Sequence, residues 1–200
     1  ANCGYTQSDE ITMVLYTEDT NSQLYFGGRF FKITSTLAAK ASVFFNRELP
    51  KYLPEKANAM PTFDCRVWQV PTLMEATNVF LWREQDAVKN SITMAARCYY
   101  SDNELLNVNG AEKQEMLFQK GINWNDYPTF FKRGSYIQRR QVNRKLTAAE
   151  LLELPEKHNA RKNPDMIVER SEVSVVEMPI LSTITNRVET IIYGELPKLV

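Results

Sequence analysis

Residues 1–16 read ANCGYTQSDEITMVLY, and this stretch decides the fold of the chain. Residues 11–16 are β-branched and apolar enough to form a strand, and a shorter strand-like piece precedes them. The polar run QSDE at residues 7–10 separates the two pieces and suits the tip of a β-hairpin. Strands joined by a short tip pair antiparallel, so the pattern predicts an antiparallel sheet that begins with a hairpin.

Helix-like and strand-like segments follow the hairpin in mixed order. Apolar side chains recur every three or four positions over residues 30–47 and 72–98, which predicts two amphipathic helices. Pro50 and Pro54 are expected to break the chain after the first helix. The remaining elements are expected as a strand over residues 63–70, a strand pair over 130–142, strands over 173–178 and 190–193, and helices over 111–120 and 148–154.

This order of elements indicates an α+β protein in which helices back an antiparallel sheet. The chain has 200 residues, of which 44% are hydrophobic, so it can bury a substantial core. We expect residues 1–100 to form the main domain. Residues 101–200 are expected to form a smaller C-terminal α/β extension that carries a basic loop and strands.

Composition excludes several classes of protein. The 24 basic residues balance the 24 acidic ones, so global charge does not indicate a nucleic-acid or membrane partner. No apolar run approaches the ~18 residues that a membrane span needs. The three cysteines are far apart and form no CxxC pair, which argues against a disulfide framework or a thiolate zinc site. A reducing compartment, and hence a cytoplasmic location, is expected.

Asp9 and Glu10 are adjacent carboxylates in the predicted hairpin tip. Such a pair suits a hard cation, because Mg²⁺ commonly takes one or two carboxylates together with substrate phosphates. The alternative is a solvated turn, in which a Ser-Asp-Glu sequence is unremarkable.

Cations are concentrated between residues 130 and 145, where no acid occurs. Interleaved aromatic side chains could stack on bases, so the stripe suits contact with phosphates and nucleic acid. In the sequence FKRG at residues 131–134, a glycine beside two cations would let the backbone approach a ligand. The alternative is a solvated face whose charge is balanced by Glu150, Glu153 and Glu156. The six cations are Lys132, Arg133, Arg139, Arg140, Arg144 and Lys145.

The second long helix carries a polar face with Arg83, Asp86 and Asn90 at spacings of three and four. Most such faces are solvated and held by weak ion pairs. His158 is the only histidine and would have to be the sole base, which argues against a hydrolase that depends on a Ser-His-Asp or Cys-His arrangement.

Four motifs in this order resemble the tRNA-His guanylyltransferase-like family, whose members add nucleotides in the 3′-to-5′ direction. Together they cover about residues 4–134, and four ordered motifs are more specific than any one of them. The motifs are GYTQSDEI at residues 4–11, FDCRV at 63–67, WREQDA at 82–87 with Asn90, and GINWND at 121–126 followed by FKRG at 131–134.

The resemblance implies a polymerase-palm-like, ferredoxin-like sheet and a two-metal site that uses Mg²⁺. By resemblance, Asp9 corresponds to a carboxylate that binds both ions, and Glu10 corresponds to its acidic neighbour. Two metals and nearby cations suit an in-line phosphoryl displacement on a triphosphate. The residues expected near the ATP or GTP are Ser8, Asn90, Asn125, Asp126, Lys132 and Arg133. We therefore expect the acidic tip to face the Lys132 loop across a shared cavity.

Two departures from the family pattern refine this interpretation. Where tRNA-His enzymes carry His-Ile-Asn-Asn, residues 88–91 read VKNS, which points to the bacterial, archaeal or phage-type subgroup that repairs 5′-truncated tRNA. The family's other metal-binding aspartate lies on a strand well before the Ser-Asp-Glu motif, whereas Asp9 follows only eight residues here. We expect the chain to lack that segment and to be inactive alone unless a separate segment supplies the first strand.

The sequence thus predicts a nucleotidyltransferase that adds nucleotides to the 5′ end of tRNA. A homotetramer is expected from the family, and no membrane partner is expected. One alternative is a non-catalytic RNA-binding or assembly module that keeps the basic stripe. Another is a nucleotide cyclase that shares the palm, which would explain Asp9 and Glu10 but not the later motifs.

Overall fold

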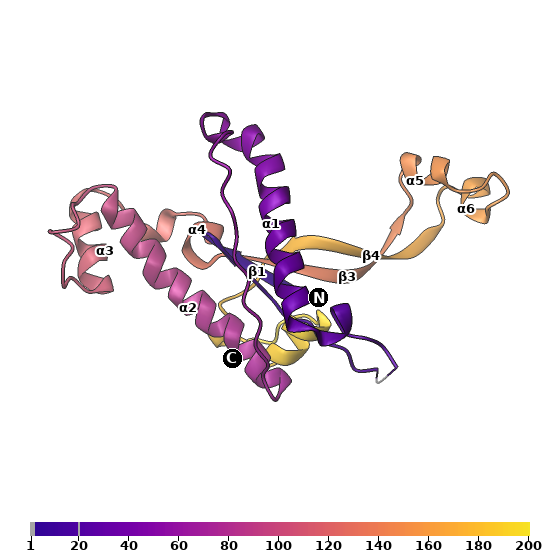
Figure 1. Ribbon diagram of the computed structural model, residues 1–200, viewed down its shortest axis with the longest axis horizontal. Helices are drawn as coiled ribbons and strands as arrows, with labels where there is room; N and C mark the ends of the chain where they lie inside the picture. Colours follow the sequence, from indigo (N-terminus) through magenta and orange to yellow (C-terminus); the bar gives the residue numbers. More distant parts are fainter. Residues whose placement is uncertain (1–2, 20) are drawn as a thin grey trace. The chain divides into compact units, whose positions relative to one another are not determined.

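A computed structural model describes residues 3–19 and 21–200 (Figure 1). The chain divides into two compact units. The sheet unit combines the segment up to Val14 with Thr72–Val200, and the insertion unit is Leu15–Pro71. The predicted boundary at residue 100 stays a prediction, although the sheet takes strands from both sides of it.

The sheet unit contains a four-stranded sheet in the order β2-β1-β3-β4, and every neighbouring pair is antiparallel. This confirms the predicted α+β class. Strand β1 (Cys3–Gln7) and strand β2 (Glu10–Met13) form the predicted hairpin. Gln7 pairs with Glu10, so the tip has only two residues, and Ser8 takes a φ of 54°. A two-residue hairpin turn requires such a left-handed conformation.

Strand β3 (Ser135–Lys145) and strand β4 (Ile167–Val176) form a second, longer hairpin. Strand β1 pairs only with residues 135–138 of β3, so the rest of this hairpin continues past the sheet. We call residues 139–173 the arm; at its end lie helices α5 (Ala148–Glu153) and α6 (Asn159–Lys162), visible in Figure 1. The helix predicted over residues 148–154 is confirmed.

The strand pair predicted over residues 130–142 is wrong: from Ser135 the segment is part of the single strand β3, which pairs with β1 and β4, and its first residues are helical. Residues Thr129–Arg133 form helix α4, because Pro128 supplies the carbonyl that accepts hydrogen bonds from the amides of Phe131 and Lys132. Gly134, with a φ of 76°, then ends this helix and precedes β3.

Helix α2 (Leu73–Arg97) packs on one face of the sheet and confirms the helix predicted there. Its Phe80 is fully buried and lies 6.4 Å, ring to ring, from Tyr136 of β3, which is 4.9 Å from Tyr5 of β1. The C-terminal segment completes this core. The buried members are Cys3, Tyr5, Phe80, Ala87, Tyr136, Met178, Leu181, Ile184, Ile191 and Ile192.

The strand predicted over residues 190–193 is wrong. Residues Glu189–Tyr193 form a single π-helical turn, η5, in which Thr190, Ile191 and Ile192 are all buried. A strand would point alternate side chains to opposite faces, whereas a helical turn can bury three consecutive positions against the core. Gly194 ends the turn with a φ of 75°.

A second, smaller core lies at the far end of α2. Helix α3 (Gly110–Gln119) confirms the prediction within a residue at each end and begins with a capping box between Asn109 and Glu112. Its Leu117 packs on Ala95 and Ala96 of α2. This core holds the end of α2 beside the loop that follows α3.

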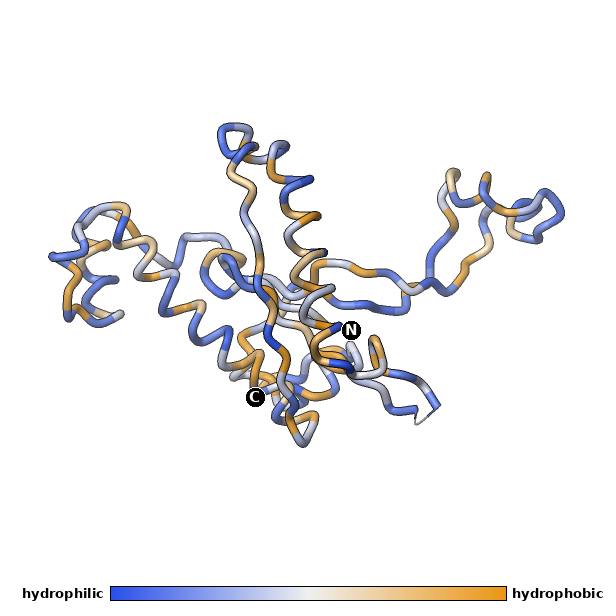
Figure 2. Tube along the Cα trace, viewed as in Figure 1, coloured by the Kyte–Doolittle hydropathy of each residue, from blue (hydrophilic) through white to orange (hydrophobic). Residues whose placement is uncertain are grey.

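The insertion unit is built on helix α1 (Phe30–Tyr52), which is longer than predicted. The expected break at Pro50 is wrong, because a proline in the last turn removes a single backbone hydrogen bond and the helix ends two residues later. Figure 2 shows apolar and polar residues alternating along α1 and along α2, as amphipathic helices require.

The strand predicted over residues 63–70 is also wrong. None of the described residues pairs with this segment as a strand partner. It runs beside α1, where the Phe63 amide donates to Ser42 Oγ (2.9 Å) and the Phe63 ring lies 5.3 Å from that of Phe45. Alternate side chains are therefore half-buried against a helix, which produces the same two-residue period as a sheet.

None of the helices within the described ranges is long and apolar enough to cross a membrane.

Candidate functional site

The hairpin tip presents one unpaired carboxylate. The side chains of Ser8 and Asp9 are exposed, and that of Asp9 makes no hydrogen bond or ion pair with any of the described residues. Glu10 differs, because its carboxylate forms an ion pair with the guanidinium of Arg83 on α2. The two adjacent acids predicted as a pair therefore have different surroundings.

The polar face of α2 continues from this ion pair as a connected series of side chains. Arg83 Nη2 lies 3.6 Å from Asp86 Oδ2, which accepts a hydrogen bond from Asn90 Nδ2 at 3.2 Å. The Arg83 guanidinium also lies 4.9 Å from the ring of Trp82. We call Glu10, Arg83, Asp86 and Asn90 the polar chain. It connects the predicted site residues Glu10 and Asn90.

A second group of predicted residues meets where η3 (Trp124–Asp126) lies against α4. Lys132 Nζ donates to the Asn125 carbonyl at 2.5 Å and lies 5.6 Å from the centre of the Trp124 ring. Ser91 of α2 contacts both segments, because its Oγ accepts from Trp124 Nε1 (3.2 Å) and its hydroxyl is shared between the carbonyls of Val88 (2.9 Å) and Lys132 (3.3 Å). Asp126 is exposed on the same turn. We call residues 124–134 the Lys132 loop.

Arg133 faces inward, unlike the free cation expected from the sequence. Its Nη1 is buried and lies 4.0 Å from Glu84 Oε2, and its carbonyl accepts a hydrogen bond from Tyr5 Oη at 2.8 Å. Glu84 in turn accepts from Tyr136 Oη at 3.0 Å and from the Leu181 amide at 2.9 Å. These contacts join α4 to β1, α2, β3 and the C-terminal segment.

Sequence reasoning missed Glu84, because it occupies a position in the apolar stripe of α2 where a carboxylate is not expected. The one sequence feature that could have indicated its burial is its position in the helical repeat of α2, on the same face as buried residues. Burial raises the pKa of Glu84 above the ordinary 4.5, while the hydrogen bonds from Leu181 and Tyr136 and the charge of Arg133 act in the opposite direction. Burial, followed by the charge of Glu84, likewise raises the pKa of Tyr136.

Gly134 lets the Lys132 loop approach the first strand closely. A Cβ at this position would lie 2.6 Å from the Thr6 carbonyl oxygen and 2.6 Å from the Tyr5 hydroxyl. The glycine was predicted to let the backbone approach a ligand, and in the structure the backbone it approaches is that of β1.

The acidic tip and the Lys132 loop therefore lie at the same end of β1. Thr6 is the second-to-last residue of β1, and it pairs with Ser135, which directly follows the Lys132 loop. Both elements also contact α2, the tip through Arg83 and the loop through Ser91, and eight residues of helix separate these points by about 12 Å. The cavity expected between tip and loop stays a prediction.

The oxygen ligands at the tip fit a metal ion whose other ligands come from a bound substrate. No group of three or more His, Cys, Asp or Glu side chains suited to a metal ion occurs in residues 3–19 and 21–200. The free Asp9 carboxylate is nevertheless a suitable ligand for Mg²⁺, which often binds through one carboxylate, waters and the phosphates of its substrate.

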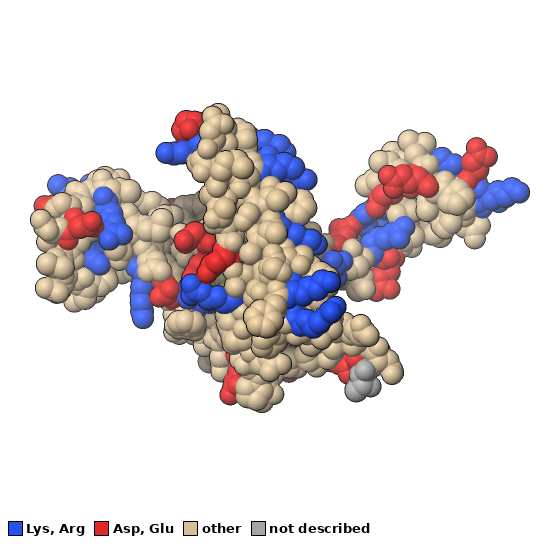
Figure 3. All heavy atoms as spheres, in the orientation of Figure 1, with Lys and Arg blue, Asp and Glu red and all other residues tan. Residues whose placement is uncertain are grey.

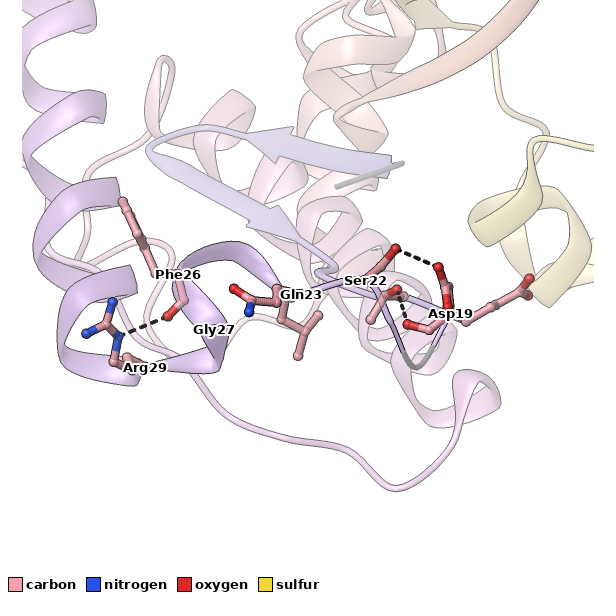
Figure 4. A pocket seen from close by; sticks show the side chains of 9 residues that line it. Asp19, Ser22, Gln23, Phe26, Gly27 and Arg29 are labelled. Atoms are coloured by element: carbon pink, nitrogen blue, oxygen red, sulfur yellow. Dashed lines mark hydrogen bonds between the residues drawn. The ribbon is translucent and has the colours of Figure 1, made fainter.

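The surface of the described residues has two hollows. One of about 850 Å³ belongs to the insertion unit, where Asp19 accepts from Ser22 Oγ (3.1 Å) and Arg29 Nε donates to the Phe26 carbonyl (3.2 Å), as Figure 4 shows. No predicted site residue lines it. The other, of about 480 Å³, lies between α3 and η3 and includes the predicted residue Asn125.

Two cations of the arm, Arg144 and Lys145, are paired with acids. Arg144 forms ion pairs with Glu150 (2.8 Å) and Glu172, and Lys145 pairs with Asp165 at 2.7 Å. Figure 3 shows basic and acidic side chains side by side over this region. Charge balance by Glu150, the alternative drawn from the sequence, is thus confirmed for Arg144.

Comparisons with known proteins agree on one family. A family profile described as tRNAHis guanylyltransferase matches residues 1–71. The tRNA(His) guanylyltransferase of Debaryomyces hansenii is 31% identical over 151 residues, which are 68% of this chain and 55% of the relative. That of Saccharomyces cerevisiae is 27% identical over 150 residues, or 68% and 62%. The chain thus spans somewhat more than half the length of these curated relatives.

Solved structures extend the likeness over most of the chain. A bacterial tRNA(His) guanylyltransferase-like protein in complex with ATP is 33% identical, with a TM-score of 0.65, and the match covers 90% of this chain and 66% of that one. A structure of such a protein with GTP is 33% identical, with a TM-score of 0.61 over 90% and 64% of the two chains.

Proposed function

The chain belongs to the tRNA-His guanylyltransferase family, and from this premise we propose that it acts as a nucleotidyltransferase on the 5′ end of tRNA, in the 3′-to-5′ direction. One observation carries the proposal: the free Asp9 carboxylate and the Lys132 loop lie at the same end of β1. Such proximity suits a nucleoside triphosphate that contacts both. Its relatives with ATP and GTP support the choice of ligand.

The residues of the tip and the loop have distinct roles in this proposal. Asp9 would hold Mg²⁺, with the exposed Ser8 beside it, and Glu10 completes the acidic tip. Two Mg²⁺ ions, when bound, would stabilise the attacking and leaving oxygens of the phosphoryl transfer. Lys132 supplies positive charge to the triphosphate, and Asn125 and Asp126 lie on the turn beside it.

Two further predicted residues support this arrangement from α2 and α4. Asn90 donates a hydrogen bond to Asp86 and directly precedes Ser91, which contacts the Lys132 loop. Arg133 adds a positive charge behind the loop. Because its guanidinium faces the buried Glu84, its main effect is to fix the position of Lys132.

The reaction has two steps that one site can serve. In the first step, the tRNA 5′-monophosphate attacks the α-phosphate of ATP or GTP and pyrophosphate leaves. In the second step, the 3′-hydroxyl of the incoming nucleotide attacks the activated 5′-phosphate, and AMP or GMP leaves. Val88 stands where tRNA-His enzymes have histidine, which favours repair of 5′-truncated tRNA over dedicated tRNA-His guanylylation. The working form is a homotetramer in this proposal.

Incorporation of labelled GTP into a 5′-truncated tRNA, with and without Mg²⁺, tests the proposal. Because the chain is expected to be inactive alone, the assay includes a separate segment that supplies the family's first palm strand. We then expect incorporation that requires Mg²⁺ and is lost in Asp9→Asn. The matched control is Asp102→Asn, because Asp102 is an exposed carboxylate beyond the end of α2 and pairs with Arg97. Incorporation that persists in Asp9→Asn would contradict the proposal.

The same assay separates the alternatives. Cyclic nucleotide formed from ATP or GTP without RNA would favour a cyclase. Salt-sensitive RNA binding without any incorporation would favour a non-catalytic RNA-binding module.

A further inference from the structure

The ion pair between Glu10 and Arg83 connects the acidic tip to α2. The Arg83 side chain is only 15% exposed, whereas that of Glu10 is 51% exposed. The guanidinium also has Asp86 at 3.6 Å and the Trp82 ring at 4.9 Å. Arg83 is thus the fixed member of the pair, and Glu10 is the member that it holds.

This arrangement distinguishes two acids that the sequence treats as equivalent. Glu10 pairs with Gln7 in the hairpin ladder and its charge is compensated by Arg83. Asp9 lies in the two-residue turn, exposed and without a side-chain partner among the described residues. The Arg83 charge lowers the affinity of the ion-paired Glu10 carboxylate for a cation, whereas the carboxylate of Asp9 has no such charge paired with it among the described residues.

We propose that Arg83 is a positioning residue, which holds the Glu10 carboxylate against α2 and leaves Asp9 as the carboxylate that meets a divalent cation. This inference rests on the proposed function, because it assumes that a cation binds at the tip. It adds that Glu10 acts through Arg83 and the hairpin and does not ligate the cation.

Electrostatics makes the proposal testable by a double-mutant cycle. Arg83→Met removes a positive charge near the cation and frees Glu10 to approach it, so the affinity for a cation rises. Glu10→Gln leaves the Arg83 charge uncompensated, so the affinity falls. The double variant removes one charge of each sign, and its affinity returns close to that of the unaltered chain.

The measurement is Mn²⁺ binding to the 200-residue chain by electron paramagnetic resonance, with Mn²⁺ alone as the probe. We expect affinity several-fold higher in Arg83→Met, several-fold lower in Glu10→Gln, and within about twofold of the unaltered chain in the double variant. Asp9→Asn is expected to lose about tenfold or more. The matched control is Arg97→Met, another α2 arginine in an ion pair, which should change nothing.

Thermal unfolding of each variant shows whether it folds. Arg83→Lys provides a second test, since it keeps the charge but loses the paired geometry of the guanidinium; it should bind Mn²⁺ like the unaltered chain. Weaker Mn²⁺ binding in a folded Arg83→Met, or a loss in Glu10→Gln as large as in Asp9→Asn, would overturn the inference alone. If the unaltered chain binds no Mn²⁺, the metal site of the proposed function fails, and the inference fails with it.

Discussion

Gly134→Ala tests how closely the Lys132 loop must approach β1. The residue combines a φ of 76° with a ψ of −170°, a region that essentially only glycine adopts, at a cost of about 1–3 kcal/mol for other residues. The added methyl would also lie 2.6 Å from the Thr6 carbonyl and from Tyr5, which is only 2% exposed and has no room to retreat. Overpacking of this kind costs about 1–3 kcal/mol more.

We therefore expect Gly134→Ala to lower the free energy of unfolding by about 2–6 kcal/mol. Urea unfolding followed by circular dichroism measures this loss. Gly121→Ala is the matched control, because Gly121 has the same φ of 76° but no atom within 4 Å of the position that an added methyl would take, and it should lose only about 1–2 kcal/mol. Equal losses in the two variants would refute the close approach of loop and strand.

Three further predictions concern the supports of the site. The pKa of Glu84 is higher in the folded chain than its ordinary 4.5, so the free energy of unfolding should fall as the pH rises from 4.5 through the folded pKa. Urea titrations at several pH values measure this fall, and Glu84→Gln should remove it. Phe80→Ala should cost about 3–5 kcal/mol in the same assay, because Phe80 is fully buried. Asn109→Ala should cost about 1 kcal/mol through loss of the α3 cap, and no change would show that the cap is dispensable.

Local patterns predicted the parts of the fold that depend on local physics. The polar tip between two apolar strands was sufficient for the β1–β2 hairpin, and the helical period was sufficient for α2 and α3. The failures at residues 63–70 and 190–193 needed tertiary information. Residues 63–70 have the period of a strand, but a helix and not a sheet buries their alternate side chains.

In the candidate site, the residue types could be predicted from the sequence, but most of their contacts could not. The acids of the tip and the cations of the Lys132 loop were identified from residue type, because carboxylates and cations suit metal ions and phosphates. Their contacts depend on pairing between distant segments, which no local pattern encodes. Sequence reasoning thus missed the buried Glu84 behind Arg133, and it placed Arg83 on the correct face of α2 without its partner Glu10.

The most direct test of one shared site is to map ATP binding on the chain by NMR. Backbone amide shifts are recorded as ATP is added in the presence of Mg²⁺. We predict that the amides of residues 8–10 and of the Lys132 loop shift together and with the same apparent affinity, since both contact one triphosphate. Shifts at only one of these elements, or only around the hollow between residues 17 and 29, would contradict the claim that tip and loop form a single nucleotide site.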